Sequence, residues 1–174
     1  MNSLDPDPKF DPASMSEDAY LERLYSKFRQ DLIERSIRWK RNNAYVRLRR
    51  EPEIKGRHAI FWHIVSGGSN NEPDRTLDPE RCRRIHWIRL LVEQFNIDHP
   101  QKSTELHWWI SDDPRWQKEP RYVLATLDYD YVVIIQEKRT YALLVTAYYV
   151  ETPRRRAKFR EQHDRYWQKQ EPLA

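Results

Sequence analysis

The feature that most constrains the fold is a series of four β-type segments near the end of the chain. The segments are residues 106–110, 122–127, 131–136 and 140–150. They are rich in β-branched and aromatic residues, and turn formers such as Asp128-Tyr129-Asp130 separate them. Consecutive strands with short connections pair in opposite directions, because a parallel pair needs a long crossover. These segments predict an antiparallel meander of about four strands.

Three further segments carry the signals of helices. They are residues 16–37, 78–96 and 152–168. Ser16 is the expected N-cap of the first, and apolar residues recur every four positions after it. Asp78 and Pro79 supply an N-cap and a first-turn proline to the second. We therefore predict an α+β fold in which N-terminal and C-terminal helices pack on the meander.

Two shorter segments are predicted to be extended. The apolar run from Arg57 to Val65 ends before Gly67-Gly68 and has the composition of a buried strand. An alternating piece lies around residues 45–49. On the last long strand, residues 141, 143, 145, 147 and 149 are expected to face the core.

The 174 residues suit one domain. Residues 1–13, rich in Asp and Pro, are predicted to be a flexible acidic arm, and residues 14–174 a single domain. Cys82, the one cysteine, has no partner for an internal disulfide, and the N-terminus lacks the pattern of a signal peptide. No apolar stretch approaches the ~20 residues of a membrane-spanning helix. We expect a cytoplasmic protein with no membrane partner.

The distribution of positive charge is more informative than the formal net charge of +4. Arginines gather at residues 47–50, 81–89 and 154–160, with tryptophans and tyrosines between them. Such interleaving suits phosphates and bases, so RNA is the predicted partner. Solvated helix and strand faces are the alternative interpretation of each run. The predicted RNA contacts are Trp62, Arg81, Trp87, Arg154, Arg155, Arg156 and Lys158.

The three arginines at positions 154–156 are unusual because they follow the predicted helix start at Pro153. The helix dipole is already positive there, and acidic residues are normally preferred. A bound anion would relieve this conflict, through backbone N–H groups and bidentate arginine contacts. The alternative is that Glu151 and solvent screening suffice.

His63, Thr146 and Tyr148 are the residues whose chemistry suits a cleavage site. An imidazole near a strand end can act as general acid or base close to neutral pH. Thr146 and Tyr148 share one face of the last strand, where their hydroxyls would bind a phosphate. The alternatives are an ordinary core or edge histidine and two residues that simply favour β-structure.

Several function classes are excluded because their motifs are missing. The chain has no Walker loop, no G-x-G-x-x-G, no H-E-x-x-H and no C-x-x-C. Asp128 and Asp130 flank a tight turn and are interpreted as turn formers rather than metal ligands. We predict neither a metal nor a cofactor.

Three segments carry a resemblance to a known family. They are residues 56–64, 84–89 and 144–149, followed by the basic helix. Together they resemble the phage- and plasmid-associated branch of the nuclease superfamily named for barnase, EndoU, colicin and RelE. The resemblance implies a metal-independent ribonuclease of the toxin type, in which the ribose 2′-hydroxyl attacks its own phosphate. It implies that the residues around the scissile phosphate are His63, Arg84, Arg89, Thr146 and Tyr148.

The resemblance also bears on partners. A toxin of this type would be neutralised by an acidic antitoxin or immunity protein that covers the basic face. The alternative function is a non-catalytic nucleic-acid- or protein-binding accessory protein of a phage or plasmid, which would use the same basic and aromatic surface.

Overall fold

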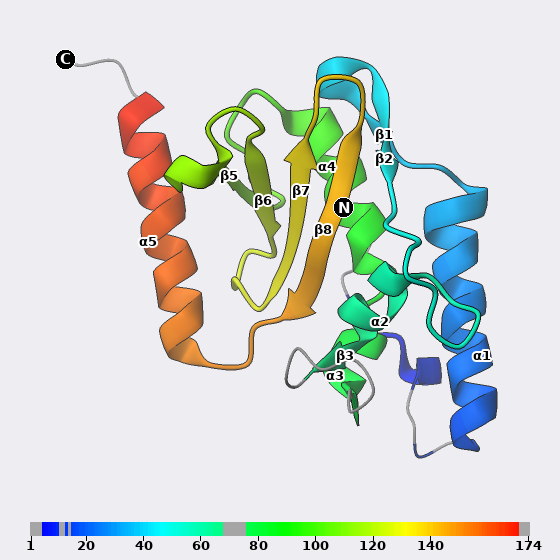
Figure 1. The fold of residues 1–174 in the computed structure, drawn as a ribbon. Helices are drawn as coiled ribbons and strands as arrows, with labels where there is room; N and C mark the ends of the chain where they lie inside the picture. Colours follow the sequence, from blue (N-terminus) through cyan, green and yellow to red (C-terminus); the bar gives the residue numbers. More distant parts are fainter. Residues whose placement is uncertain (1–4, 11–12, 14, 68–75, 171–174) are drawn as a thin grey trace.

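A six-stranded sheet lies at the centre of the molecule in the computed structural model (Figure 1). The structure describes residues 5–10, 13, 15–67 and 76–170. The sheet has the order β1-β2-β8-β7-β6-β5, and β3 pairs separately with β4. The strands are β1 (Arg38–Trp39), β2 (Ala44–Arg47), β3 (Ser66–Gly67), β4 (Thr76–Leu77), β5 (His107–Ile110), β6 (Arg121–Ala125), β7 (Tyr131–Glu137) and β8 (Ala142–Tyr149).

Helices precede, separate and follow these strands, which confirms the α+β prediction. The longer helices are α1 (Glu17–Phe28), α2 (Ala59–Val65), α4 (Trp87–Asp98) and α5 (Pro153–Gln170). The shorter helical segments are η1 (Pro8–Phe10), η3 (Arg29–Glu34), η4 (Lys40–Asn42), α3 (Pro79–Cys82) and η6 (Pro114–Trp116). No helix among the described residues has both the length and the apolar character needed to cross a membrane.

The predicted meander is present as β5, β6, β7 and β8, each antiparallel to the next. The turn between β6 and β7 shows why the connection is short. Thr126 Oγ1 accepts hydrogen bonds from the backbone N–H groups of Asp130 and Tyr131, both at 3.1 Å. Tyr129, which precedes these two residues in the turn, adopts a left-handed conformation with φ of 56°. The turn residues predicted from sequence therefore close this hairpin.

The sheet is larger than predicted and is not purely antiparallel. β2 pairs in parallel with β8 through Val46↔Ala142, and β1 adds a sixth strand beyond it. The short alternating piece near residue 45 was expected to be extended, but a local pattern contains no information about a partner almost a hundred residues away.

The prediction of a strand at residues 57–65 is wrong, because this segment contains helix α2. Its buried positions include Ile60, Phe61, Ile64 and Val65, a spacing that matches one face of a helix. Nearly every residue of this run is apolar, so the two-residue period of a strand and the 3.6-residue period of a helix fit it equally well. Burial between α1 and β8 decides in favour of the helix.

The predicted helix at residues 78–96 is divided into α3 and α4. Asp78 caps α3 as expected, since its Oδ1 accepts from the backbone N–H of Glu80 at 2.9 Å. In a continuous helix the carbonyl of Glu80 would accept the backbone N–H of Arg84. Instead this carbonyl accepts the Arg84 guanidinium at 2.9 Å, and the Arg84 N–H bonds to the Arg81 carbonyl. The helix consequently restarts at Trp87.

The first and last helices agree with the sequence. Ser16 caps α1 by accepting from the backbone N–H of Ala19, and Tyr20, Leu24 and Phe28 are buried. α5 begins at Pro153 and runs along β5, where Trp167 Nε1 donates to the Trp108 carbonyl at 2.9 Å.

Two hydrophobic clusters lie on opposite faces of the sheet. The larger includes side chains of α1, α2 and α4, and the smaller lies under α5. On β8 the buried residues are Ala142, Leu144 and Ala147, and Tyr149 packs half-buried against the larger cluster. The predicted core face is therefore right at Ala147 and Tyr149 and wrong at the positions before them. A bulge opposite Ile134 and Ile135 adds one residue to β8 and exchanges the two faces before Ala147.

Only part of the predicted acidic arm lies within the described residues, and residues 1–4 and 11–12 do not. In the described part, the Asp7 N–H donates to the Arg83 carbonyl at 2.9 Å. Trp87 Nε1 donates to the Asp5 carbonyl at 3.4 Å. Residues 5–7 therefore lie against the start of α4.

Candidate nucleic-acid interface

The C-terminal end of β8 brings together four arginines and two tyrosines from separate elements. Tyr148 and Tyr149 end the strand, two arginines come from the α3 region, and two from the first turn of α5. Figure 1 shows this end of β8 between α3 and the start of α5. We call this group the arginine–tyrosine cluster. It consists of Arg81, Arg84, Tyr148, Tyr149, Arg155 and Arg156.

Tyr148 lies between two guanidinium groups. The Cζ atom of Arg81 is 5.6 Å from the centre of the tyrosine ring, and that of Arg155 is 5.3 Å from it. Both distances suit a cation–π contact. Burial raises the pKa of the Tyr148 phenol even though both arginines act against this change. The phenol is therefore a neutral hydrogen-bonding group near neutral pH.

Tyr149 has a similar pair of neighbours. Arg84 Cζ lies 4.5 Å and Arg156 Cζ 5.6 Å from the centre of its ring. Arg156 Nη2 also donates to the Tyr149 hydroxyl at 3.0 Å, and Arg156 Nε donates to the Val150 carbonyl at 2.8 Å. Arg156 thus connects the start of α5 to the end of β8.

The arginines of the cluster differ in how their charge is balanced. Arg81 Nε lies 3.1 Å from Asp78 Oδ2, and Arg84 forms an ion pair with Glu80. Arg155 and Arg156 form no ion pair with a carboxylate among the residues that the structure describes. The first turn of α5 contains no acidic residue. The α5 side of the cluster therefore carries uncompensated positive charge.

The backbone of this turn is less available to an anion than the sequence suggested. The N–H groups of Arg155 and Arg156 both donate to the Thr152 carbonyl, at 3.0 and 3.2 Å. Any anion here must be bound mainly by side chains. Arg154, Arg155 and Lys158 are exposed and suited to this role.

A buried polar group lies beneath the cluster. The Tyr131 hydroxyl is fully buried and has no hydrogen-bond partner among the described residues, and the same is true of Arg84 Nε. Burial raises the pKa of Tyr131, whereas the charges of Arg81 and Arg84 lower it. Such unpaired groups are rare inside proteins and occur more often near functional sites.

His63 lies on α2 rather than at the end of a strand. Its carbonyl accepts a hydrogen bond from Arg81 Nη1 at 3.4 Å, so its main chain adjoins the cluster. Thr146 precedes Tyr148 by two residues on β8, is half-buried and pairs with Ile134. Of the predicted residues, the structure brings Arg81, Arg84, Tyr148, Arg155 and Arg156 into one group.

Three predicted residues have structural contacts elsewhere. Arg89 is buried, donates to the Asp31 carbonyl at 2.8 Å and pairs with Glu93. Trp87 is 3% exposed. Trp62 is half-buried and donates to the Ile54 carbonyl at 2.9 Å. Neither Arg89 nor Trp87 presents a side chain that a large ligand can reach.

Sequence reasoning missed Tyr149 and Tyr131. Tyr149 was assigned to the core, and its ring does pack half-buried against the larger cluster, but the same ring also contacts Arg84 and Arg156. Tyr131 is the register partner of Tyr149, a pairing that depends on the bulge in β8 and could not be predicted from the hairpin alone.

Comparison with known proteins gives no match to any protein-family model, any curated protein or any solved structure. The resemblance to a nuclease superfamily therefore stays a prediction.

Proposed function

We propose that this protein binds RNA at the arginine–tyrosine cluster and along the exposed side of the first two turns of α5. The observation that supports this proposal best is the pair of half-buried tyrosine rings, each between two guanidinium groups, beside cations without carboxylate partners. Arginine forks bind phosphate oxygens, and arginine and tyrosine planes stack on unpaired bases.

Three exposed cations of α5 extend the same positive region. Arg154, Lys158 and Arg160 are exposed on α5, and none forms an ion pair within the described part of the chain. A strand of RNA lying across this helix would release counterions from its phosphates, so its binding would weaken as salt rises. This requires no base-specific pocket and suits single-stranded RNA of mixed sequence.

The ion pairs of Arg84 and Arg89 support binding of RNA better than cleavage. Both were expected to stabilise charge on a reacting phosphate, but each pairs with a glutamate of its own helical region. Cleavage of the toxin type is the second candidate. The contact between Arg81 and the main chain of His63 favours it, because that contact brings an imidazole-bearing helix to the cluster.

The test is a titration of fluorescent single-stranded RNA at several salt concentrations. The double variant Arg154→Glu/Arg155→Glu removes two phosphate contacts, so the slope of log affinity against log salt should decrease by about 1.4. Arg165→Glu/Lys169→Glu reverses two charges on later turns of α5 and should leave the slope unchanged. Equal slopes for all three proteins would exclude the proposed surface.

The same samples separate binding from cleavage. Intact RNA after prolonged incubation in EDTA, with tight binding, is the expected result. Cleavage that is lost in His63→Ala would instead favour the ribonuclease.

A further inference from the structure

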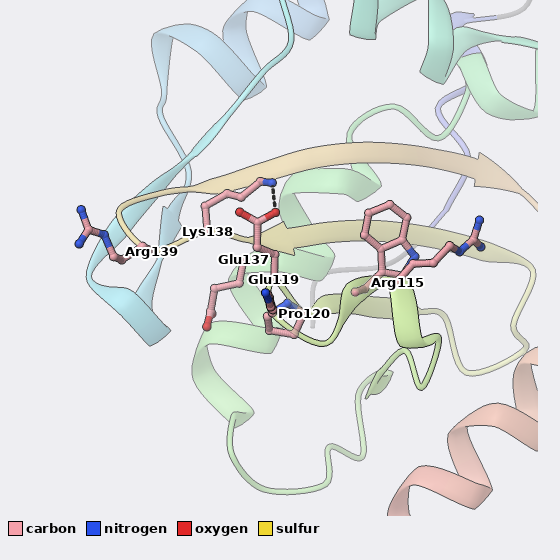
Figure 2. A pocket seen from close by; sticks show the side chains of 8 residues that line it. Arg115, Glu119, Pro120, Glu137, Lys138 and Arg139 are labelled. Carbon is pink, nitrogen blue, oxygen red and sulfur yellow. Dashed lines mark hydrogen bonds and ion pairs between the residues drawn. The ribbon is translucent and has the colours of Figure 1, made fainter.

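A second basic feature lies at the opposite end of β7 from the arginine–tyrosine cluster. It is a groove of about 720 Å³ between η6, the start of β6 and the β7–β8 turn. Figure 2 shows the side chains around it. Its lining consists of Arg115, Trp116, Lys118, Glu119, Pro120, Glu137, Lys138 and Arg139. The volume is in the range of small-molecule sites.

Both acidic residues of the groove are already neutralised. Glu119 forms an ion pair with Lys138, which Figure 2 marks with a dashed line. Glu137 Oε2 accepts hydrogen bonds from Arg41 Nε at 2.8 Å and from Trp39 Nε1 at 2.6 Å, and neither donor residue lines the groove. Neither carboxylate is therefore an unpaired negative charge facing a ligand.

Two cations of the lining have no such partner. Lys118 and Arg139 form no ion pair within the described residues, whereas Arg115 pairs with Asp113. In Figure 2 Arg115 and Arg139 lie at opposite ends of the groove, with the Glu119–Lys138 pair between them. The groove is thus elongated and positive.

An aromatic platform adjoins these cations. The guanidinium of Arg121 stacks on Trp116, with Cζ 3.4 Å from the ring centre, and Arg115 lies 5.7 Å from the same ring. Arg121 Nε is buried without a hydrogen-bond partner among the described residues. Trp116 is only half-buried and lines the groove. Its orientation is therefore set before a ligand arrives.

We propose that this groove binds a nucleotide, with its base against Trp116 and its phosphate between Lys118 and Arg139. A planar base gains from an indole face, and lysine and arginine contribute charge to the phosphate. A free nucleotide and one residue of an RNA strand share this chemistry. The site is separate from the arginine–tyrosine cluster and does not depend on RNA binding there.

The test is calorimetric titration of the full chain with AMP, with adenosine and with inorganic phosphate. AMP should bind more tightly than either fragment. Trp116→Ala should weaken AMP about tenfold and leave phosphate unaffected, because stacking is lost. Lys118→Ala/Arg139→Ala should weaken both AMP and phosphate.

One variant should strengthen binding, which a misfolded protein would not do. Glu119→Gln frees Lys138 for the phosphate, so AMP affinity should rise several-fold. Arg165→Glu/Lys169→Glu serves as the unchanged control. Equal affinity for AMP and phosphate, or an affinity that does not respond to Trp116→Ala and Glu119→Gln, would overturn the proposal.

Two further comparisons distinguish this groove from the arginine–tyrosine cluster and identify the source of the nucleotide. Arg154→Glu/Arg155→Glu should weaken RNA but not AMP. If Trp116→Ala weakens RNA as well as AMP, the nucleotide belongs to an RNA strand. If it weakens AMP alone, the ligand is a free nucleotide. Failure of the RNA-binding proposal would leave the AMP result unaffected.

Discussion

Single residues at the end of β8 explain why the proposed interface is positive and aromatic. Tyr148 was predicted because it lies on the more polar face of a predicted strand, and Arg155 because it follows a helix start. Their contact was not predictable, since it depends on how α5 leaves the sheet. Leu143 and Val145 were assigned to the wrong face because a bulge in β8 cannot be recognised from alternation alone.

Tyr131 permits a stability test at this scale. Its hydroxyl is buried without a partner among the described residues, so Tyr131→Phe should increase the free energy of unfolding by about 1 kcal/mol. Tyr149→Phe is the matched comparison. It removes the acceptor of the Arg156 hydrogen bond and should decrease the free energy by about 1 kcal/mol. Urea denaturation measures both, and a destabilised Tyr131→Phe protein would show that this hydroxyl is bonded.

At the scale of elements, the sequence was informative where signals were local. Ser16, Asp78 and Pro153 begin helices as predicted, and the meander follows from closely spaced turns. The segment 59–65 was misassigned because a short run that is apolar throughout has no clear periodicity. The break between α3 and α4 escaped detection because it depends on the side chain of Arg84.

A substitution in the first turn of α5 should change stability and RNA binding in opposite directions. Arg154 is exposed beside the positive end of an 18-residue helix that has no acidic residue in its first turn. Arg154→Glu should increase the free energy of unfolding by about 0.3–1 kcal/mol through the helix dipole while it weakens RNA binding. Thermal denaturation and RNA titration of the same variant measure the two effects. A variant that binds RNA normally would remove Arg154 from the interface.

At the scale of the whole molecule, the order of the strands in the sheet could not be predicted from the sequence. Pairing of β2 with β8 joins segments from opposite halves of the chain. Neither segment contains a local signal for the other. Most residues of the candidate site were predicted one by one, but their convergence at the end of β8 was not.

Burial of histidines should make the whole fold sensitive to acid. Burial lowers the pKa of His58, His86, His99, His107 and His163. As pH falls below about 6.5, the unfolded chain takes up protons before the folded chain does, so stability that is present above this pH is lost. The urea midpoint should decrease between pH 7.5 and pH 5.5. A midpoint that stays constant or rises would contradict the burial of these side chains.

The most direct measurement of the central proposal is ultraviolet cross-linking of single-stranded RNA to the protein, with the adducts mapped by mass spectrometry. We expect adducts at Tyr148 or Tyr149 and on the peptides that form the first two turns of α5. Adducts confined to α1 or to the β1–β2 hairpin, with none near the end of β8, would contradict it.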